Sequence, residues 1–186
     1  MKFKILLALL PIIFIMSCKN DKPTNAADGT KTAVKSDLFN VSFDLIIKKD
    51  DNMCLYYTED GSVNFSDKNT IWVPVKGSEN VQKVVFSFPE DVLPSTFRVD
   101  FGHGKNELQS DVALKKFKMT YQDKIAELDG TSIFTFFVPF DAYTKVIPGT
   151  STLQRLTVAQ DGGPIVYPLE TLAKKITEIT SGASPE

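Results

Sequence analysis

Apolar and polar residues alternate over most of the middle of this chain, and this alternation limits the fold more than any other feature. In the first alternating run the apolar side chains share one parity: Phe39, Val41, Phe43, Leu45 and Ile47. A period of two is typical of a β-strand with one buried face. Similar runs, separated by turn-forming residues, recur at 53–58, 70–76, 82–88, 96–102, 113–121 and 125–128. Many short strands without intervening helices predict a mainly β chain, folded as an antiparallel β-sandwich or jelly roll.

Two segments depart from the alternation. Residues 133–139 form a nearly continuous apolar run, which we interpret as a strand buried on both sides. Further along, apolar residues recur at helical spacing: Leu169, Leu172, Ala173, Ile176 and Ile179. We therefore expect one C-terminal amphipathic helix that covers an open end or edge of the sheets. Pro168 is expected at its start, because proline suits a first helical turn.

The first residues have the layout of a signal peptide. A short basic start, Met1 to Lys4, precedes an apolar run from Ile5 to Met16. This run is shorter than the about 20 residues that a membrane-spanning helix needs, and it contains Pro11. The run ends in Ile15-Met16-Ser17-Cys18, which resembles the lipobox of bacterial lipoproteins. The resemblance implies cleavage before Cys18 and lipidation of that cysteine; an ordinary secretory signal with an incidental cysteine is the alternative.

These features divide the chain into four expected parts. Residues 1–17 are the lipoprotein signal peptide, and residues 18–37 hold the lipidated cysteine and a flexible polar tether. The β-sandwich domain is expected over residues 38–180, and a polar tail over 181–186. We expect localisation in the cell envelope, lipid-anchored at the outer membrane. The protein could there face the periplasm or be exposed on the surface.

The charge of the chain argues against a nucleic-acid partner. Removal of Lys2 and Lys4 with the signal leaves 19 Lys and Arg against 23 Asp and Glu, or about −4. Affinity for nucleic acid comes mainly from clustered basic residues that neutralise phosphates. The basic residues of this chain are scattered, so no nucleic acid is predicted as a partner.

The sequence offers few residues for catalysis or metal binding. His103 is the single histidine, and no Gly-x-Ser-x-Gly motif presents a nucleophile. With Cys18 lipidated, Cys54 is expected as a small buried or half-buried hydrophobe rather than a reactive thiol. These counts exclude a zinc site of the usual His and Cys type. The chain is therefore predicted not to be an enzyme. No cofactor is predicted, although oxygen-rich loops at 50–52 and 67–69 leave calcium as an option.

The middle of the chain, roughly residues 39–121, also resembles a known type of domain. The segments that carry the likeness are Leu55–Gly61, Ile71–Ser78, Val84–Pro89 and Phe97–Gly102. They are similar to a β-sandwich module of uncharacterised, lipid-anchored proteins of the Bacteroidetes. Such modules look like the jelly rolls of carbohydrate-binding families. The resemblance implies the fold and carries no activity over to this chain.

A candidate binding face follows from the strand alternation. If one parity serves the core, the pleat turns the other parity to the opposite face. The sugar-compatible side chains of that second parity are Tyr56, Trp72, Arg98 and Asp100, together with Lys116 and Lys118. An aromatic ring can stack on a pyranose while Arg and Asp bond its hydroxyls. The alternative is that Trp72 packs under a loop or under the terminal helix.

We therefore expect a lipid-anchored envelope protein that binds glycan and contacts the membrane through its lipid. One alternative is a non-catalytic structural or assembly subunit of an envelope complex, in which the same face docks a protein. A hydrolase is the remote alternative.

Overall fold

The computed structural model describes residues 37–103, 111–156 and 162–182. The predicted signal peptide, Cys18, nearly all of the tether and the last four residues of the polar tail lie outside the described residues. None of the described helices is long and apolar enough to cross a membrane.

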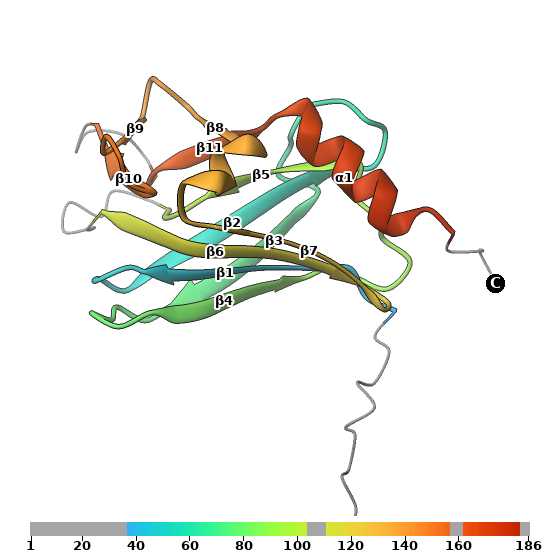
Figure 1. Cartoon of the computed structure of the whole chain (residues 1–186), viewed down its shortest axis with the longest axis horizontal. Helices are drawn as coiled ribbons and strands as arrows, with labels where there is room; N and C mark the ends of the chain where they lie inside the picture. Colours follow the sequence, from blue (N-terminus) through green and yellow to red (C-terminus); the bar gives the residue numbers. More distant parts are fainter. Residues whose placement is uncertain (1–36, 104–110, 157–161, 183–186) are drawn as a thin grey trace, which may run out of the picture. The chain divides into compact units, whose positions relative to one another are not determined.

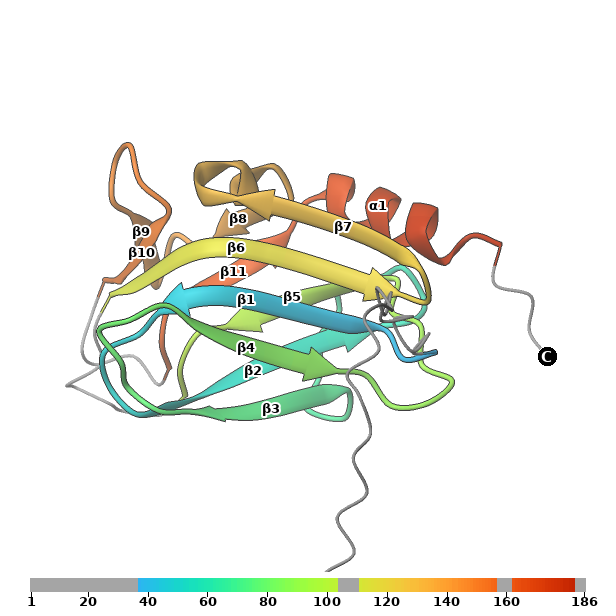
Figure 2. The ribbon, with the colours of Figure 1, turned by 60° about the horizontal axis from the view of Figure 1, so that its bottom comes forward.

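The described residues form two antiparallel β-sheets packed as a sandwich, which confirms the predicted fold class (Figures 1 and 2). The strands of sheet A are β1 (Asn40–Ile46), β4 (Gln82–Ser87), β6 (Val112–Tyr121), β7 (Lys124–Asp129), β9 (Thr144–Val146) and β10 (Thr152–Arg155). Their order is β4-β1-β6-β10-β9, with β7 also paired to β6. The strands of sheet B are β2 (Asp51–Thr58), β3 (Thr70–Val75), β5 (Thr96–Asp100), β8 (Phe137–Pro139) and β11 (Ile165–Pro168). Their order is β3-β2-β5-β11-β8.

Phenylalanine rings from both sheets fill the core between them. Phe43 of β1 lies 5.2 Å, between ring centroids, from Phe117 of β6 and from Phe101, which follows β5. Phe137 of β8 is 5.2 Å from Phe117. Contacts of this kind contribute about 0.5–1.5 kcal/mol each beyond the area that they bury. The alternation within the strands thus places their apolar side chains in one core shared by both sheets.

The C-terminal helix α1 (Glu170–Thr180) confirms the predicted amphipathic helix. It buries Leu172, Ile176 and Ile179 in the core. The helix contacts β7 and β6 of sheet A as well as β11 and β5 of sheet B, so it covers one side of the sandwich between the sheets (Figure 2). The predicted start is wrong. Pro168 ends strand β11, and Leu169 is the N-cap of the helix.

The prediction of one strand over residues 133–139 is also wrong. The structure has a 3-10 helix, η1 (Gly130–Thr135), followed by the short strand β8. Gly130 has a φ of 54°, a left-handed conformation that glycine adopts without strain. Ser132 then donates its hydroxyl to the carbonyl of Asp129 at 2.6 Å and accepts the Asp129 N–H at 3.1 Å. These local bonds turn the chain, so that only Ile133 of the helix is buried.

Candidate functional site

The outer face of sheet B brings together the four predicted ligand-binding residues. The register of β2 with β3 places Trp72 opposite Cys54. The register of β2 with β5 places Asp100 opposite Cys54 and Arg98 opposite Tyr56. Directly paired residues of neighbouring strands point to the same face of a sheet. The four predicted residues and Cys54 therefore share one surface of sheet B, the face turned away from the core.

Trp72 is the exposed member of this group. It is 44% exposed, so the described loops and helix α1 leave a large part of it uncovered. Its ring makes an edge-to-face contact with His103 at 4.5 Å between centroids. His103 is itself exposed, and its backbone N–H donates to the Asp51 carboxylate at 3.0 Å. The strand β3 and this loop residue thus hold the indole in place while leaving much of it open to solvent.

Arg98 and Asp100 form an ion pair beside the tryptophan. Nε and NH2 of Arg98 donate to the two carboxylate oxygens of Asp100 at 2.8 and 2.9 Å. NH1 donates to the hydroxyl of Tyr167 at 3.1 Å, and the guanidinium lies 4.1 Å from the centroid of the Tyr56 ring. Phe65, from the loop before β3, reaches within 5.9 Å of the same guanidinium.

Burial controls the ionisation of this pair. Arg98 and Asp100 expose only 17% and 11% of their side chains. Burial raises the pKa of Asp100, and the Arg98 guanidinium offsets part of that effect. Burial also disfavours the charge of Arg98, yet its contacts with Asp100 and Tyr167 outweigh this and raise its pKa. In this two-point contact the hydrogen bonds of both groups are directed at each other rather than at solvent.

Cys54 lies under the same surface and is fully buried, as predicted. Burial, reinforced by the charge of Asp100, raises the pKa of its thiol to about 12. Burial and the neighbouring Cys54 likewise raise the pKa of Tyr56 to about 12. Both groups are therefore neutral at physiological pH, and a protonated thiol is a poor nucleophile.

A second aromatic group on this face was missed by sequence reasoning. The Tyr167 ring of β11 lies 5.4 Å from Phe140, whose ring lies 5.3 Å from Tyr143. Phe140 and Tyr143 are 37% and 38% exposed. No alternating run contains these residues, because β8 and β11 are too short to show a period. The one available signal was the concentration of aromatic residues in this part of the sequence.

Lys116 and Lys118 do not belong to this face, and the prediction that grouped them with Trp72 is wrong. Both lie on β6, which is a strand of sheet A. Lys116 pairs there with Glu127 at 3.6 Å and Asp129 at 3.5 Å, both on β7. The pleat predicts on which side of its strand a residue lies. It does not predict which of the two sheets that strand joins.

The loop at 50–52 uses its carboxylates within the protein. Asp50 accepts hydrogen bonds from Lys76 at 2.5 Å and from the N–H of Gly77 at 2.9 Å. Its neighbour Asp51 accepts the N–H groups of Asn52 at 2.8 Å and of His103. Within residues 37–103, 111–156 and 162–182, no group of three or more His, Cys, Asp or Glu side chains could hold a metal ion. The described structure thus offers no support for the calcium option.

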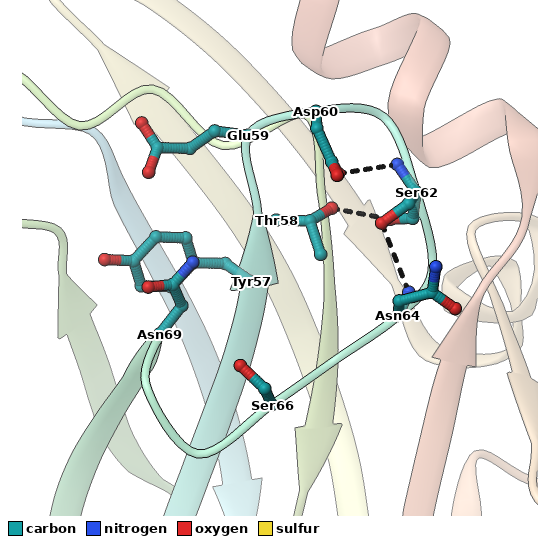
Figure 3. A pocket seen from close by; sticks show the side chains of 8 residues that line it. All are labelled: Tyr57, Thr58, Glu59, Asp60, Ser62, Asn64, Ser66 and Asn69. Carbon is teal, nitrogen blue, oxygen red and sulfur yellow. Dashed lines mark hydrogen bonds between the residues drawn. The ribbon is translucent and has the colours of Figure 1, made fainter.

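A polar cavity of about 290 Å³ lies between the end of β2 and the loop that follows it (Figure 3). It is lined by Tyr57, Thr58, Glu59, Asp60, Ser62, Asn64, Ser66 and Asn69. Several of these groups are bonded to the loop itself. Thr58 donates to the Ser62 carbonyl at 2.6 Å, and the Ser62 N–H donates to Asp60 at 2.9 Å. Tyr57, the one aromatic residue of the lining, is only 7% exposed. The cavity therefore lacks an open aromatic surface, which the outer face of sheet B has.

No family model, no curated protein and no solved structure matches this chain.

Proposed function

We propose that this chain is a lipid-anchored protein of the cell envelope that binds glycan on the outer face of sheet B and performs no chemistry on it. The observation that carries the proposal is the position of Trp72. Its indole is 44% exposed, rests against His103 and lies on the same face as Tyr56, Arg98 and Asp100. Tryptophan side chains are on average highly buried in folded proteins. An indole that is held open to solvent therefore suggests a contact surface.

The rest of the face supports a binding role rather than a catalytic one. The thiol of Cys54 and the phenol of Tyr56 are held neutral by burial. The carboxylate of Asp100 is engaged by Arg98. An acid or base in catalysis needs a pKa near the working pH and reach to the substrate. Binding of a sugar needs no such group, and the exposed indole of Trp72 supplies an aromatic surface on which a sugar ring can stack.

The experiment is a fluorescence titration of Trp72, the single tryptophan of the chain. We expect the emission of an exposed indole in the free protein and a shift when a bound polysaccharide covers it. Trp72→Ala should weaken retardation in affinity electrophoresis by roughly 2- to 10-fold, the effect of losing an aromatic contact of ~0.5–1.5 kcal/mol. Ile125→Ala is the matched control, because Ile125 is 58% exposed on β7 of sheet A.

A protein-docking role for the same face predicts a different result. In that case no polysaccharide shifts the Trp72 emission or retards the protein. An envelope protein would instead co-purify with the intact chain from membranes, and Trp72→Ala would release it. That outcome would replace glycan binding by the assembly-subunit alternative.

A further inference from the structure

We propose that the ligand of the outer face of sheet B is an extended, uncharged glycan chain that crosses the strands from Trp72 to Phe140 and Tyr143. This inference rests on the proposed function and specifies the class of ligand. It follows from two features of the face: exposed aromatic residues at both edges of the sheet, and the absence of an unpaired charge on the strands between them.

The exposed aromatic residues lie at opposite edges of sheet B. Trp72 is on β3 and Phe140 directly follows β8, the two outermost strands of the sheet. The N–H of Phe140 donates to the carbonyl of Ile165 at 2.9 Å, which continues the pairing of β8 with β11. Four strand spacings of ~4.8 Å separate the two edges by roughly 19 Å. A single sugar can contact one edge only, whereas a chain of several sugars can contact both.

Aromatic contacts continue across the middle of the face. Tyr167 joins Phe140 to Arg98, with centroid distances of 5.4 Å to the Phe140 ring and 5.4 Å to the guanidinium. Arg98 in turn lies over the ring of Tyr56 at 4.1 Å. These residues are less exposed than the edge residues. Tyr56 is only 8% exposed and the Arg98 side chain 17%, so the proposed glycan chain would contact the sheet chiefly at its two edges.

The charges on this face cancel. Of the residues on β2, β3, β5, β8 and β11 whose side chains point outward, only Arg98 and Asp100 are charged, and each is bonded to the other at two points. Beside the sheet, Lys76 is paired with Asp50 at 2.5 Å. A carboxylated or sulfated glycan would therefore find no unpaired cation on these five strands. The desolvation of its charge would cost free energy without a compensating partner.

The test uses the full chain and two sets of probes. The neutral set comprises oligosaccharides of increasing length from an α-glucan, a β-glucan and a mannan; the acidic set comprises polygalacturonate and its oligosaccharides. For a neutral probe we expect affinity to rise with chain length and to change little between ~0.01 and ~0.1 M salt. Tyr143→Ala should weaken binding of the long chain by roughly 2- to 10-fold, while binding of the shortest probe at Trp72 stays unchanged.

The outcomes separate this inference from the proposed function. Equal affinity for short and long neutral probes, or no effect of Tyr143→Ala on the long chain, would overturn the extended ligand. Tight, salt-sensitive binding of polygalacturonate in preference to neutral probes would overturn the uncharged ligand. In each of these cases Trp72→Ala would still weaken binding, so the proposed function would stand. If no probe of either set shifts Trp72 emission, the proposed function itself fails.

Discussion

Arg98 is the residue around which the outer face of sheet B is organised. Its guanidinium contacts Asp100 two positions away in the chain and Tyr167 sixty-nine positions away. The side of the strand that Arg98 occupies could be predicted, because the pleat fixes it. Its burial could not, because Phe65 and Tyr167 reach it from a loop and from a short strand that show no period in the sequence. Trp72 illustrates the converse, since only the fold shows that much of its side chain is exposed.

The Arg98–Asp100 pair should make an asymmetric contribution to stability. Asp100→Ala leaves a mostly buried guanidinium without its partner, and we expect the free energy of unfolding to fall by ~3–5 kcal/mol. Replacing both residues by leucine should cost less than Asp100→Ala alone, because no unpaired charge remains. Urea denaturation measures both changes. Asp50→Ala, which removes the exposed pair with Lys76, is the control and should change stability little. Equal effects of Asp100→Ala and Asp50→Ala would contradict the buried-pair description.

Cys54 should make the stability of the protein depend on alkaline pH. Burial raises the pKa of its thiol to about 12 in the folded state, against ~8.5 in an unfolded chain. Between these values the folded state holds a proton that the unfolded state has lost, so stability falls as pH rises, by on the order of 1 kcal/mol per pH unit. Urea denaturation of wild type and Cys54→Ala from pH 8 upward should show a difference in slope that starts near ~8.5. Parallel pH profiles of the two proteins would show that the thiol ionises equally in both states.

At the scale of elements, long alternating runs were predictable and short ones were not. The strands from β1 to β7 all lie where the alternation indicates them. The segment after β7 was misjudged because Gly130 and Ser132 turn the chain into a 3-10 helix, which local hydrogen bonds decide. The hairpin of β9 with β10, and strand β11, have three or four residues each, too few to establish a period. These short strands extend both sheets, so the second half of the candidate site was invisible in the sequence.

Helix α1 should stabilise the sandwich through its buried face. Leu172 and Ile176 are 0% and 1% exposed and lie in the core shared by both sheets. Leu172→Ala or Ile176→Ala should lower the free energy of unfolding by ~2–5 kcal/mol, the usual cost of such cavities. Lys174→Ala, on the solvent-facing side of the same helix, is the matched control and should have little effect. Urea denaturation measures the free energy of unfolding of all three variants. A small loss of stability for both Leu172→Ala and Ile176→Ala would mean that the helix is not part of the cooperative core.

At the scale of the whole molecule, the proposed anchor and the proposed binding face use different parts of the sequence. The segment that carries Cys18 leads into β1, which lies between β4 and β6 in sheet A. The exposed Trp72 belongs to strand β3 of sheet B, Phe140 directly follows β8 of the same sheet, and the ring of Tyr143 contacts that of Phe140. The proposed attachment thus depends on Cys18 and the proposed binding on sheet B. We expect a substitution that removes one of these functions to leave the other unchanged.

Cys18→Ser tests the anchor by itself. The lipobox-like Ile15-Met16-Ser17-Cys18 predicts that the thiol carries the lipid, and each buried methylene of an acyl chain contributes ~0.8 kcal/mol to membrane binding. We expect the variant to lose labelling by a radioactive fatty acid and to leave the membrane fraction, since no other anchor is predicted. Cys54→Ala is the matched control: it removes the other cysteine, which is buried, and should keep both labelling and membrane attachment. A Cys18→Ser protein that is still cleaved at the same bond and remains in the membrane fraction would contradict the lipoprotein proposal, whatever the outer face of sheet B binds.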